Sequence, residues 1–291
     1  MKKLNTADLK IDLLYIGPIF IVYTMLFVWP LIDGLRISLT NWDGVSTTFT
    51  YVGFRNYIRM FTQDRYFLGS LGRTFQIAFF NVIFTNVLAM LFALALTTRF
   101  RANNMYRAAI FLPNVISMVV SGFIWRFMFT QIGPAVSEAT GIKWLGMAWL
   151  GSPDIVVTSI VIVSVWWGLG YIMTIYIAAI QGIDSSIIEA GDIDGCSQWQ
   201  SFWRIKLPSM MPVVSVGIFL NVAGSLKIFD VIYSLTGGGP GRSSEVAMLN
   251  LYREAFVNQR FGMGAAKAIV LTVIIIMVTI LQRKLTEGEK S

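Results

Sequence analysis

The chain has 291 residues, of which 55% are hydrophobic and 13% are charged, and its formal net charge is +7. A soluble domain would carry about 25% charged residues, so this composition excludes a soluble globular protein. The single cysteine excludes an internal disulfide and a multi-cysteine metal site. Because the chain has no histidine, it also lacks the commonest metal ligand and proton shuttle. A phosphate-cradling GxxxxGK motif is also missing, so the chain has no nucleotide site of that type.

Six apolar stretches are long enough, alone or with a short extension, to cross a bilayer, which takes about 20 residues of helix. The first ten residues, MKKLNTADLK, resemble the basic region of a secretory signal. The apolar stretch after them is too long for a signal and lacks a small-residue cleavage pattern, so we expect an uncleaved first helix. Within a single transmembrane domain covering residues 1–291, we predict spanning helices at about residues 11–38, 72–98, 106–130, 155–181, 209–231 and 262–283.

The basic residues lie mostly in short loops and at both ends, which is typical of a membrane protein and does not favour nucleic-acid binding. Six spans place both termini on one side of the membrane. The segment between the second and third spans holds Arg99, Arg101 and Arg107 and no acid. Because cytoplasmic loops carry an excess of lysine and arginine, we predict that both termini are cytoplasmic.

The segment at about residues 184–208 lies on the cytoplasmic side in this topology, and unlike the spans it carries charge. Asp184 can cap a first short helix, and Gly191 and Gly195 are expected to interrupt it before a second short helix begins. Such a hairpin could connect two spans at the headgroup level. It could also dock a cytoplasmic partner, which its acids favour because a connector on an anionic leaflet should be basic. The residues alone leave both interpretations open.

A spacing pattern in this hairpin favours docking. Glu189-Ala190, then Gly195 after four residues, then Ile205-x-Leu207-Pro208 after nine more, resembles the EAA loop of permease subunits in ATP-binding-cassette importers. In that family the loop forms coupling helices that sit in a cleft of the ATPase subunit. The family usually has a second alanine in place of Gly191, and we expect the smaller residue to fit the same tight socket. The resemblance implies ATPase docking by Glu189, Ala190, Gly191, Asp194, Gly195, Ile205, Leu207 and Pro208.

A second segment, from Phe229 to Pro240, resembles the region after the fifth helix in permeases for sugars, oligosaccharides and glycerol phosphate. The resemblance covers nearly the whole chain. It implies an all-α membrane protein of six transmembrane helices, with the type I ABC importer permease (MetI-like) fold and cytoplasmic coupling helices, in a bacterial cytoplasmic membrane. An importer for another solute class, such as amino acids or polyamines, is the alternative, which the GGP segment disfavours.

The family also implies a set of partners. A second homologous permease would complete a heterodimer, two copies of a cytoplasmic ABC ATPase would bind ATP and Mg²⁺, and an extracytoplasmic solute-binding protein would deliver the sugar. This chain is then a non-catalytic subunit embedded in membrane lipid, with no cofactor, catalytic residue or metal ligand of its own.

The outer loop with Gly237, Gly238, Gly239 and Pro240 cannot be regular helix, because glycines there permit positive φ angles and close backbone approach. As a hypothesis, this loop faces the solute-binding protein. A plain re-entrant turn is the alternative interpretation.

Importers of this family use alternating access through a central cavity between two permease subunits. Trp167 and Tyr171 lie one turn apart in the fourth span, and Asn221 and Ser225 lie one turn apart in the fifth. Aromatic and hydrogen-bonding side chains suit the apolar faces and hydroxyl rims of sugars, so we predict that these residues line the substrate path. The alternative is that they pack against lipid or tie neighbouring helices together.

Ionisable residues at membrane depth are costly, and they usually pair or face protein or water. Lys227 and Asp230 lie three residues apart near the outer end of the fifth span. We expect them to form a structural ion pair within the helix or an outer gate, with direct substrate contact as the other interpretation.

Overall fold

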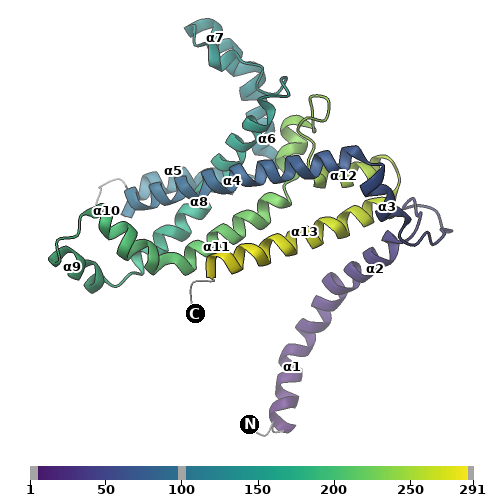
Figure 1. The fold of residues 1–291 in the computed structure, drawn as a ribbon, viewed down its shortest axis with the longest axis horizontal. Helices are drawn as coiled ribbons and strands as arrows, with labels where there is room; N and C mark the ends of the chain where they lie inside the picture. Colours follow the sequence, from purple (N-terminus) through teal and green to yellow (C-terminus); the bar gives the residue numbers. More distant parts are fainter. Residues whose placement is uncertain (1–5, 98–102, 288–291) are drawn as a thin grey trace. The chain divides into compact units, whose positions relative to one another are not determined.

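The computed structural model describes residues 6–97 and 103–287 (Figure 1). Arg99 and Arg101, on which the predicted orientation partly rests, lie outside the described residues. The regular structure of the described residues is helical, apart from one isolated antiparallel bridge between Thr40 and Tyr51. Helices suit the apolar stretches because a helix satisfies its backbone hydrogen bonds internally, where lipid offers no partner.

The chain divides into two compact units that interleave along the sequence. The first combines Met1–Arg65 with Leu251–Thr272, and the second combines Tyr66–Asn250 with Val273–Ser291. Each unit is built from two separate segments, and the single transmembrane domain over residues 1–291 stays a prediction.

The first unit begins with a continuous helical segment whose most apolar window, within Tyr15–Ser38, is 0% buried. Apolar side chains therefore cover all sides of this helix, as in a span that faces lipid or another chain. The elements of this unit are α1 (Thr6–Tyr23), η1 (Thr24–Val28), α2 (Trp29–Ser38), α3 (Arg55–Thr62), η6 (Arg253–Val257) and the first part of α13 (Phe261–Glu287).

A fully buried cation lies inside the first unit. The ammonium nitrogen of Lys267 on α13 lies 2.7 Å from a carboxylate oxygen of Asp64 and 2.9 Å from one of Glu254 on η6. Lys267 is 0% exposed, and Glu254 also pairs with Arg260 at 3.4 Å. A buried charge is tolerated only when it is paired, so these acids allow the lysine to lie within an apolar helix.

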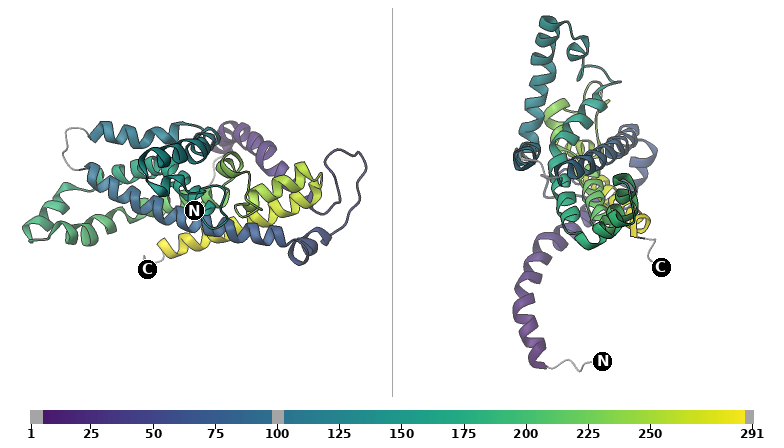
Figure 2. Two further views of the ribbon diagram at one scale, coloured as in Figure 1. Left: turned by 90° about the horizontal axis from the view of Figure 1, so that it is seen from above. Right: turned by 90° about the vertical axis from the view of Figure 1, so that its left-hand side faces the viewer.

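The second unit holds the other long helices. Within it α5, α8 and α11 pack side by side, and α9 and α10 lie at one end (Figures 1 and 2). Its elements are α4 (Arg65–Thr97), α5 (Asn103–Val115), α6 (Met118–Phe127), η2 (Met128–Ile132), α7 (Gly133–Thr140), η3 (Lys143–Gly146), α8 (Val156–Gln181), α9 (Ser185–Ile193), α10 (Gln198–Ser201), η4 (Phe202–Lys206), α11 (Leu207–Leu226), η5 (Ile232–Thr236) and α12 (Ala247–Tyr252).

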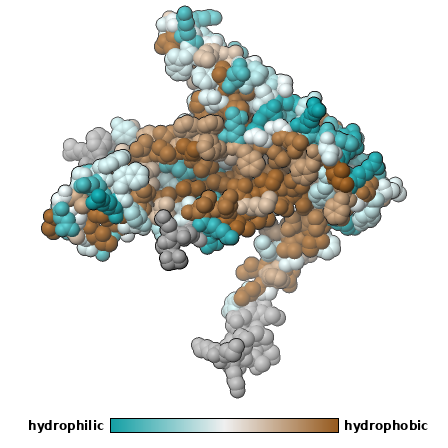
Figure 3. Space-filling view, in the orientation of Figure 1, coloured by the Kyte–Doolittle hydropathy of each residue, from teal (hydrophilic) through white to brown (hydrophobic). Residues whose placement is uncertain are grey.

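Five helices in the described part of the chain are long and apolar enough to cross a membrane, or six if a bent pair counts as one span. Hydrophobic residues cover the long helices, whereas hydrophilic residues lie around α12 and, mixed with hydrophobic ones, at the α9–α10 end (Figure 3). The bent pair is the third predicted span. Instead of one helix over residues 106–130, Asn103–Val115 and Met118–Thr140 meet at an angle of 98°.

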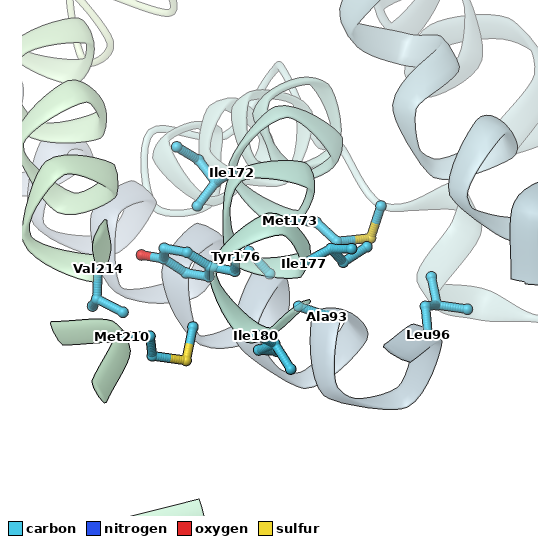
Figure 4. Packing of buried hydrophobic residues seen from close by; sticks show 10 residues of the cluster. Ala93, Leu96, Ile172, Met173, Tyr176, Ile177, Ile180, Met210 and Val214 are labelled. Atoms are coloured by element: carbon cyan, nitrogen blue, oxygen red, sulfur yellow. The ribbon is translucent and has the colours of Figure 1, made fainter. Parts of the chain in front are cut away.

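The core of the second unit lies where α4, α8 and α11 meet (Figure 4). Ala89 and Ala93 of α4 let that helix approach α8 closely, as small residues do between membrane helices. Tyr176 of α8 is fully buried and points towards α11, where the Cβ of any residue replacing Gly217 would lie 2.8 Å from the tyrosine ring. The Tyr176 hydroxyl is hydrogen-bonded to Asn86 of α4 at 2.5 Å, so one side chain ties the three helices together.

Candidate functional site

A cavity of about 400 Å³ lies between α4, α5, α8 and α11 in the second unit. Its wall includes Trp167 and Tyr171 of α8 together with Asn221 and Ser225 of α11. Each pair is four residues apart, so both members face the same side of their helix. Tyr171 is 44% exposed and Ser225 is 3% exposed, which places Ser225 deeper in the wall. The structure brings all four predicted side chains around one space.

Lys227 and Asp230 lie on the same cavity wall, just beyond the end of α11 at Leu226. Within the part of the chain that the structure describes, no ion pair joins them. Lys227 leaves helical geometry with φ of −102° and ψ of 11°, so the helical spacing that a pair three residues apart requires is lost. Both residues are exposed, and their opposite charges border the cavity separately.

A break between α5 and α6 forms another part of the wall. Pro113 lacks a backbone N–H, which weakens the helix just before the break. The indole N–H of Trp167 donates a hydrogen bond of 2.8 Å to the carbonyl of Ile116, so a side chain of α8 satisfies a backbone group at the break. Asn114 and Met118 flank the break and line the cavity. Irregular backbone at this depth is tolerated where it is buried in protein or lines a cavity.

Several cavity residues were missed by the sequence analysis. Asn81 and Thr85 enter from α4, Asn114 and Met118 from the two sides of the break, and Phe229 from the segment after α11. For Asn81 the sequence did carry a signal, because a buried amide within an apolar span calls for a polar partner. Asn114 and Met118 were missed because the bend that brings them to the cavity was not predicted.

The hairpin at residues 184–208 is capped at both of its short helices. Asp184 accepts a hydrogen bond of 3.0 Å from the backbone N–H of Ser186, and hydrogen bonds from Ser186 lower the pKa of this carboxyl. Gly195 turns the chain with a φ of +77°, a conformation that favours glycine. Ser197 and Gln200 then form a reciprocal capping box at α10. These local bonds explain a helix, a turn and a second helix.

Gly191 does not interrupt the first helix, in contrast to the prediction. It lies inside α9 and is buried, and a Cβ at this position would collide with the terminal methyl of Ile205. Gly191 therefore lets the two arms of the hairpin pack against each other. Its small size therefore serves a contact within this chain, and its fit to a socket of the ATPase stays a prediction.

The surface of the hairpin divides into two chemical parts. The acids Glu189, Asp192 and Asp194 are exposed, as is Ala190. On the second arm, Trp199 and Trp203 are exposed, and their ring centroids lie 5.6 Å apart. The closing residues differ in burial: Ile205 and Leu207 are half-buried, and Pro208 is exposed in the first turn of α11.

The loop after η5, at Gly237–Arg242, is held by backbone turns and by hydrogen bonds to Ser244. Gly237 and Gly238 have φ of +58° and +85°, which glycine adopts without strain. The Ser244 hydroxyl lies 2.6 Å from the carbonyl of Gly239, and Gly238 is buried. Gly239 and Pro240 are half-buried, whereas the next two residues, Gly241 and Arg242, are exposed at the tip.

The chain is similar to permeases of known transport systems. A model of the family "Binding-protein-dependent transport system inner membrane component" matches residues 85–288. The probable starch degradation products transport system permease protein AmyD of Thermoanaerobacterium thermosulfurigenes is 35% identical over 274 residues, which cover 94% of this chain and 93% of AmyD. The multiple sugar-binding transport system permease protein MsmF of Streptococcus mutans is 33% identical over 267 residues, and the match covers 92% of each chain.

Solved structures share the fold. A chain of a bacterial ABC transporter involved in the import of the acidic polysaccharide alginate matches with a TM-score of 0.82 at 19% identity, over 98% of this chain and 99% of that one. This likeness confirms the predicted all-α, type I ABC importer permease fold. Because the family model covers well over half of its residues, the chain belongs to the inner-membrane components of binding-protein-dependent transport systems, a family of multi-pass membrane permeases.

Proposed function

We propose that this chain is a permease subunit of an ATP-driven importer for sugars or oligosaccharides, and that it forms half of an alternating-access path. The observation that carries the proposal is the cavity of about 400 Å³ around which Trp167, Tyr171 and Asn221 meet. Relatives named for starch degradation products, multiple sugars and trehalose/maltose support this substrate class.

The chemistry of the cavity suits a sugar. The exposed ring of Tyr171 can cover the apolar face of a sugar ring, while the Asn221 amide meets a hydroxyl group. The indole N–H of Trp167 is already bonded to Ile116, so Trp167 contributes a fixed aromatic wall and no donor. At the rim, Lys227 and Asp230 offer one donor group and one acceptor group to the hydroxyls of the same ligand.

The hairpin at residues 184–208 is the proposed docking site for the ATPase. Its exposed acids, Glu189, Asp192 and Asp194, face outward from a helix pair whose arms are locked by the Gly191–Ile205 contact. The second arm continues into α11 without a loop, as one helical segment from Gln198 to Leu226. A displacement of the hairpin by the ATPase would therefore move α11, which carries Asn221 and Ser225 in the cavity wall.

The other partners and the orientation belong to the same proposal. A second homologous permease completes the path, and two copies of a cytoplasmic ATPase bind ATP and Mg²⁺. Both termini are cytoplasmic, which puts Gly237–Pro240 on the outer side with the exposed Arg242 at the tip of the loop. This outer loop receives the solute-binding protein, which the family description supports in general terms.

Uptake by the assembled importer in proteoliposomes tests this function. The complex, its solute-binding protein and internal ATP are supplied, and labelled maltose, trehalose, arginine and spermidine are compared at equal concentration. We expect ATP-dependent accumulation of a sugar and none of arginine or spermidine. Accumulation of arginine or spermidine in place of both sugars would contradict the proposed substrate class.

A further inference from the structure

Four polar side chains form a hydrogen-bonded network between α4 and α11 at the cavity wall. The Thr85 hydroxyl donates to the side-chain oxygen of Asn81 over 3.2 Å. The Asn81 amide nitrogen lies 2.8 Å from the Ser225 hydroxyl and 3.3 Å from the side-chain oxygen of Asn221. The Ser225 hydroxyl donates in turn to that same Asn221 oxygen over 3.1 Å. Two helices that are far apart in the sequence are thus joined at the cavity.

Each hydrogen bond of the network has a defined donor and a defined acceptor. Because the Asn81 oxygen accepts from Thr85, its amide nitrogen is the end that faces α11. The Asn221 oxygen then receives two donors, from Asn81 and from Ser225. The Asn221 nitrogen is the remaining end of that amide, and within the described residues no acceptor is bonded to it. The donor end of Asn221 is therefore the end presented to a ligand.

Burial keeps the network in this arrangement. Asn81 is 8% exposed, Thr85 is 1% exposed and Ser225 is 3% exposed. Turning the Asn81 amide over would set its oxygen against the Asn221 oxygen, so Asn221 would have to turn as well for the two amides to stay bonded. Turning Asn81 alone would place two acceptors together in a buried wall, which is costly, more so where the local dielectric is low.

From this geometry we infer that Asn81 is a positioning and specificity-determining residue for the cavity: it holds the Asn221 amide with its nitrogen towards the ligand. The inference rests on the proposed function, since the ligand is taken to be a sugar whose hydroxyl oxygen accepts from Asn221. The cavity thereby selects a ligand with an acceptor oxygen at this place. Thr85 acts one step further away, by orienting Asn81.

A double-mutant cycle in the assembled importer tests the role of Asn81. The readout is the apparent KM and the maximal rate of uptake, with whichever of maltose and trehalose the wild type transports faster. Asn81→Ala should raise KM about five- to tenfold, the effect of losing one oriented hydrogen bond, with little change in the maximal rate. In an Asn221→Ala background the same change should have almost no further effect, because its partner is already gone.

Asn86→Ala is the matched control. Asn86 is also an amide on α4, but it is hydrogen-bonded to Tyr176 and to the carbonyl of Val82 and lies outside the cavity lining. Its effect and that of Asn221→Ala should be additive in the free energies that correspond to KM. An additive result for Asn81 and Asn221, like that for Asn86, would reduce Asn81 to a helix-packing residue and overturn the inference.

Two variants at Thr85 test the inference if the importer with Asn81→Ala does not assemble. Thr85→Val removes the hydroxyl that orients Asn81 and should raise KM, and Thr85→Ser should restore the wild-type value because it keeps the donor. Equal KM values for Thr85→Val and wild type would also contradict the inference. If the wild type accumulates arginine or spermidine in place of both sugars, the proposed function fails and this inference fails with it. Transport by the wild type combined with additive effects overturns the inference alone.

Discussion

The indole nitrogen of Trp167 on α8 donates a hydrogen bond of 2.8 Å to the carbonyl of Ile116, at the point where α5 ends and the chain bends by 98° into α6. The carbonyl at a helix break needs a partner inside a membrane protein, and here an aromatic side chain of another helix provides it. The same tryptophan also forms part of the cavity wall. One bond therefore stabilises the bend and positions an aromatic ring beside the ligand space.

Trp167→Phe tests that bond. Phenylalanine keeps an aromatic ring but leaves the Ile116 carbonyl without its donor, which should cost about 1–3 kcal/mol. We expect a lower melting temperature of the purified chain in detergent and a weaker uptake of the sugar. Trp166→Phe is the control, because Trp166 stacks edge-on with Trp125 at 5.5 Å and its ring contact can be kept by phenylalanine. Equal melting temperatures for the two variants would contradict the role of the Trp167 bond.

Gly191 provides a prediction on the hairpin. Among the described residues, a Cβ would collide with the terminal methyl of Ile205 alone, and the next Ile205 atom is 4.0 Å away. Gly191→Ala should therefore be tolerated with a rotamer change of Ile205, at less than about 1.5 kcal/mol, partly offset by the helix preference of alanine. Gly191→Val should separate the two arms and reduce co-purification of the ATPase.

A second change identifies the cause. Ile205→Val shortens the side chain that Gly191 meets and should restore ATPase binding to the Gly191→Val variant at least in part. Failure of Gly191→Ala to bind the ATPase, with no gain from Ile205→Val, would show that residue 191 touches the partner directly.

Lys267 provides a prediction on stability. Lys267→Met removes the cation that pairs with Asp64 and Glu254 and leaves two acids facing each other without it, which should cost about 3–5 kcal/mol. We expect a large fall in the melting temperature and in the yield of folded chain. Arg260→Met is the control, because Arg260 is 60% exposed in its pair with Glu254 and such pairs contribute about 0–1 kcal/mol. Similar melting temperatures for both variants would contradict the claim that the buried Lys267 stabilises the fold more than the exposed Arg260 does.

Asp43 gives a prediction on pH. Hydrogen bonds from the Ser46 hydroxyl, and from the backbone N–H groups of Ser46 and Val45, lower its pKa from 3.8 to about 2. Because the folded-state pKa lies below the unfolded value, these bonds stabilise the loop fully above about pH 4 and are lost as the pH falls through about 2. Amide exchange at Val45 and Ser46, corrected for the intrinsic pH effect, should accelerate over that range.

Asp43→Asn isolates the titration in this loop. The asparagine oxygen can still accept from the two backbone N–H groups but does not ionise between pH 4 and 2. The variant should therefore show no such acceleration. The same pH response in the variant and the wild type would mean that another group controls the loop.

Features that depend on local sequence could be predicted from it. The ends of α8, at Val156 and Gln181, lie within one residue of the predicted span at 155–181, because a long apolar stretch bounded by polar residues determines a helix. The cap by Asp184 and the turn at Gly195 follow from the same kind of local rule. Helix-face spacing likewise predicted that Trp167 and Tyr171 would share one side of their helix.

Features that depend on contacts between distant segments could not be predicted. The hydropathy of residues 106–130 gives no sign of the 98° bend, whose carbonyl partner, Trp167, lies about fifty residues further on. Lys267 lies within the predicted sixth span, and its partner Asp64, about two hundred residues earlier, approaches it only in the folded unit. Gly191 was expected to break a helix, whereas its neighbour Ile205 determines its role.

The central claim is that the hairpin at residues 184–208 docks a partner ATPase. The motion that ATP hydrolysis causes in that ATPase is transmitted through the hairpin and drives sugar uptake. The most direct measurement compares ATP-dependent sugar uptake and ATPase co-purification for wild type, Glu189→Lys and Glu138→Lys. Glu138 is an exposed acid on α7, outside the hairpin, and serves as the charge-matched control. We predict that Glu189→Lys loses both ATPase binding and uptake and that Glu138→Lys keeps both. Normal uptake by Glu189→Lys, or sustained accumulation by the chain without any ATPase, would contradict this account.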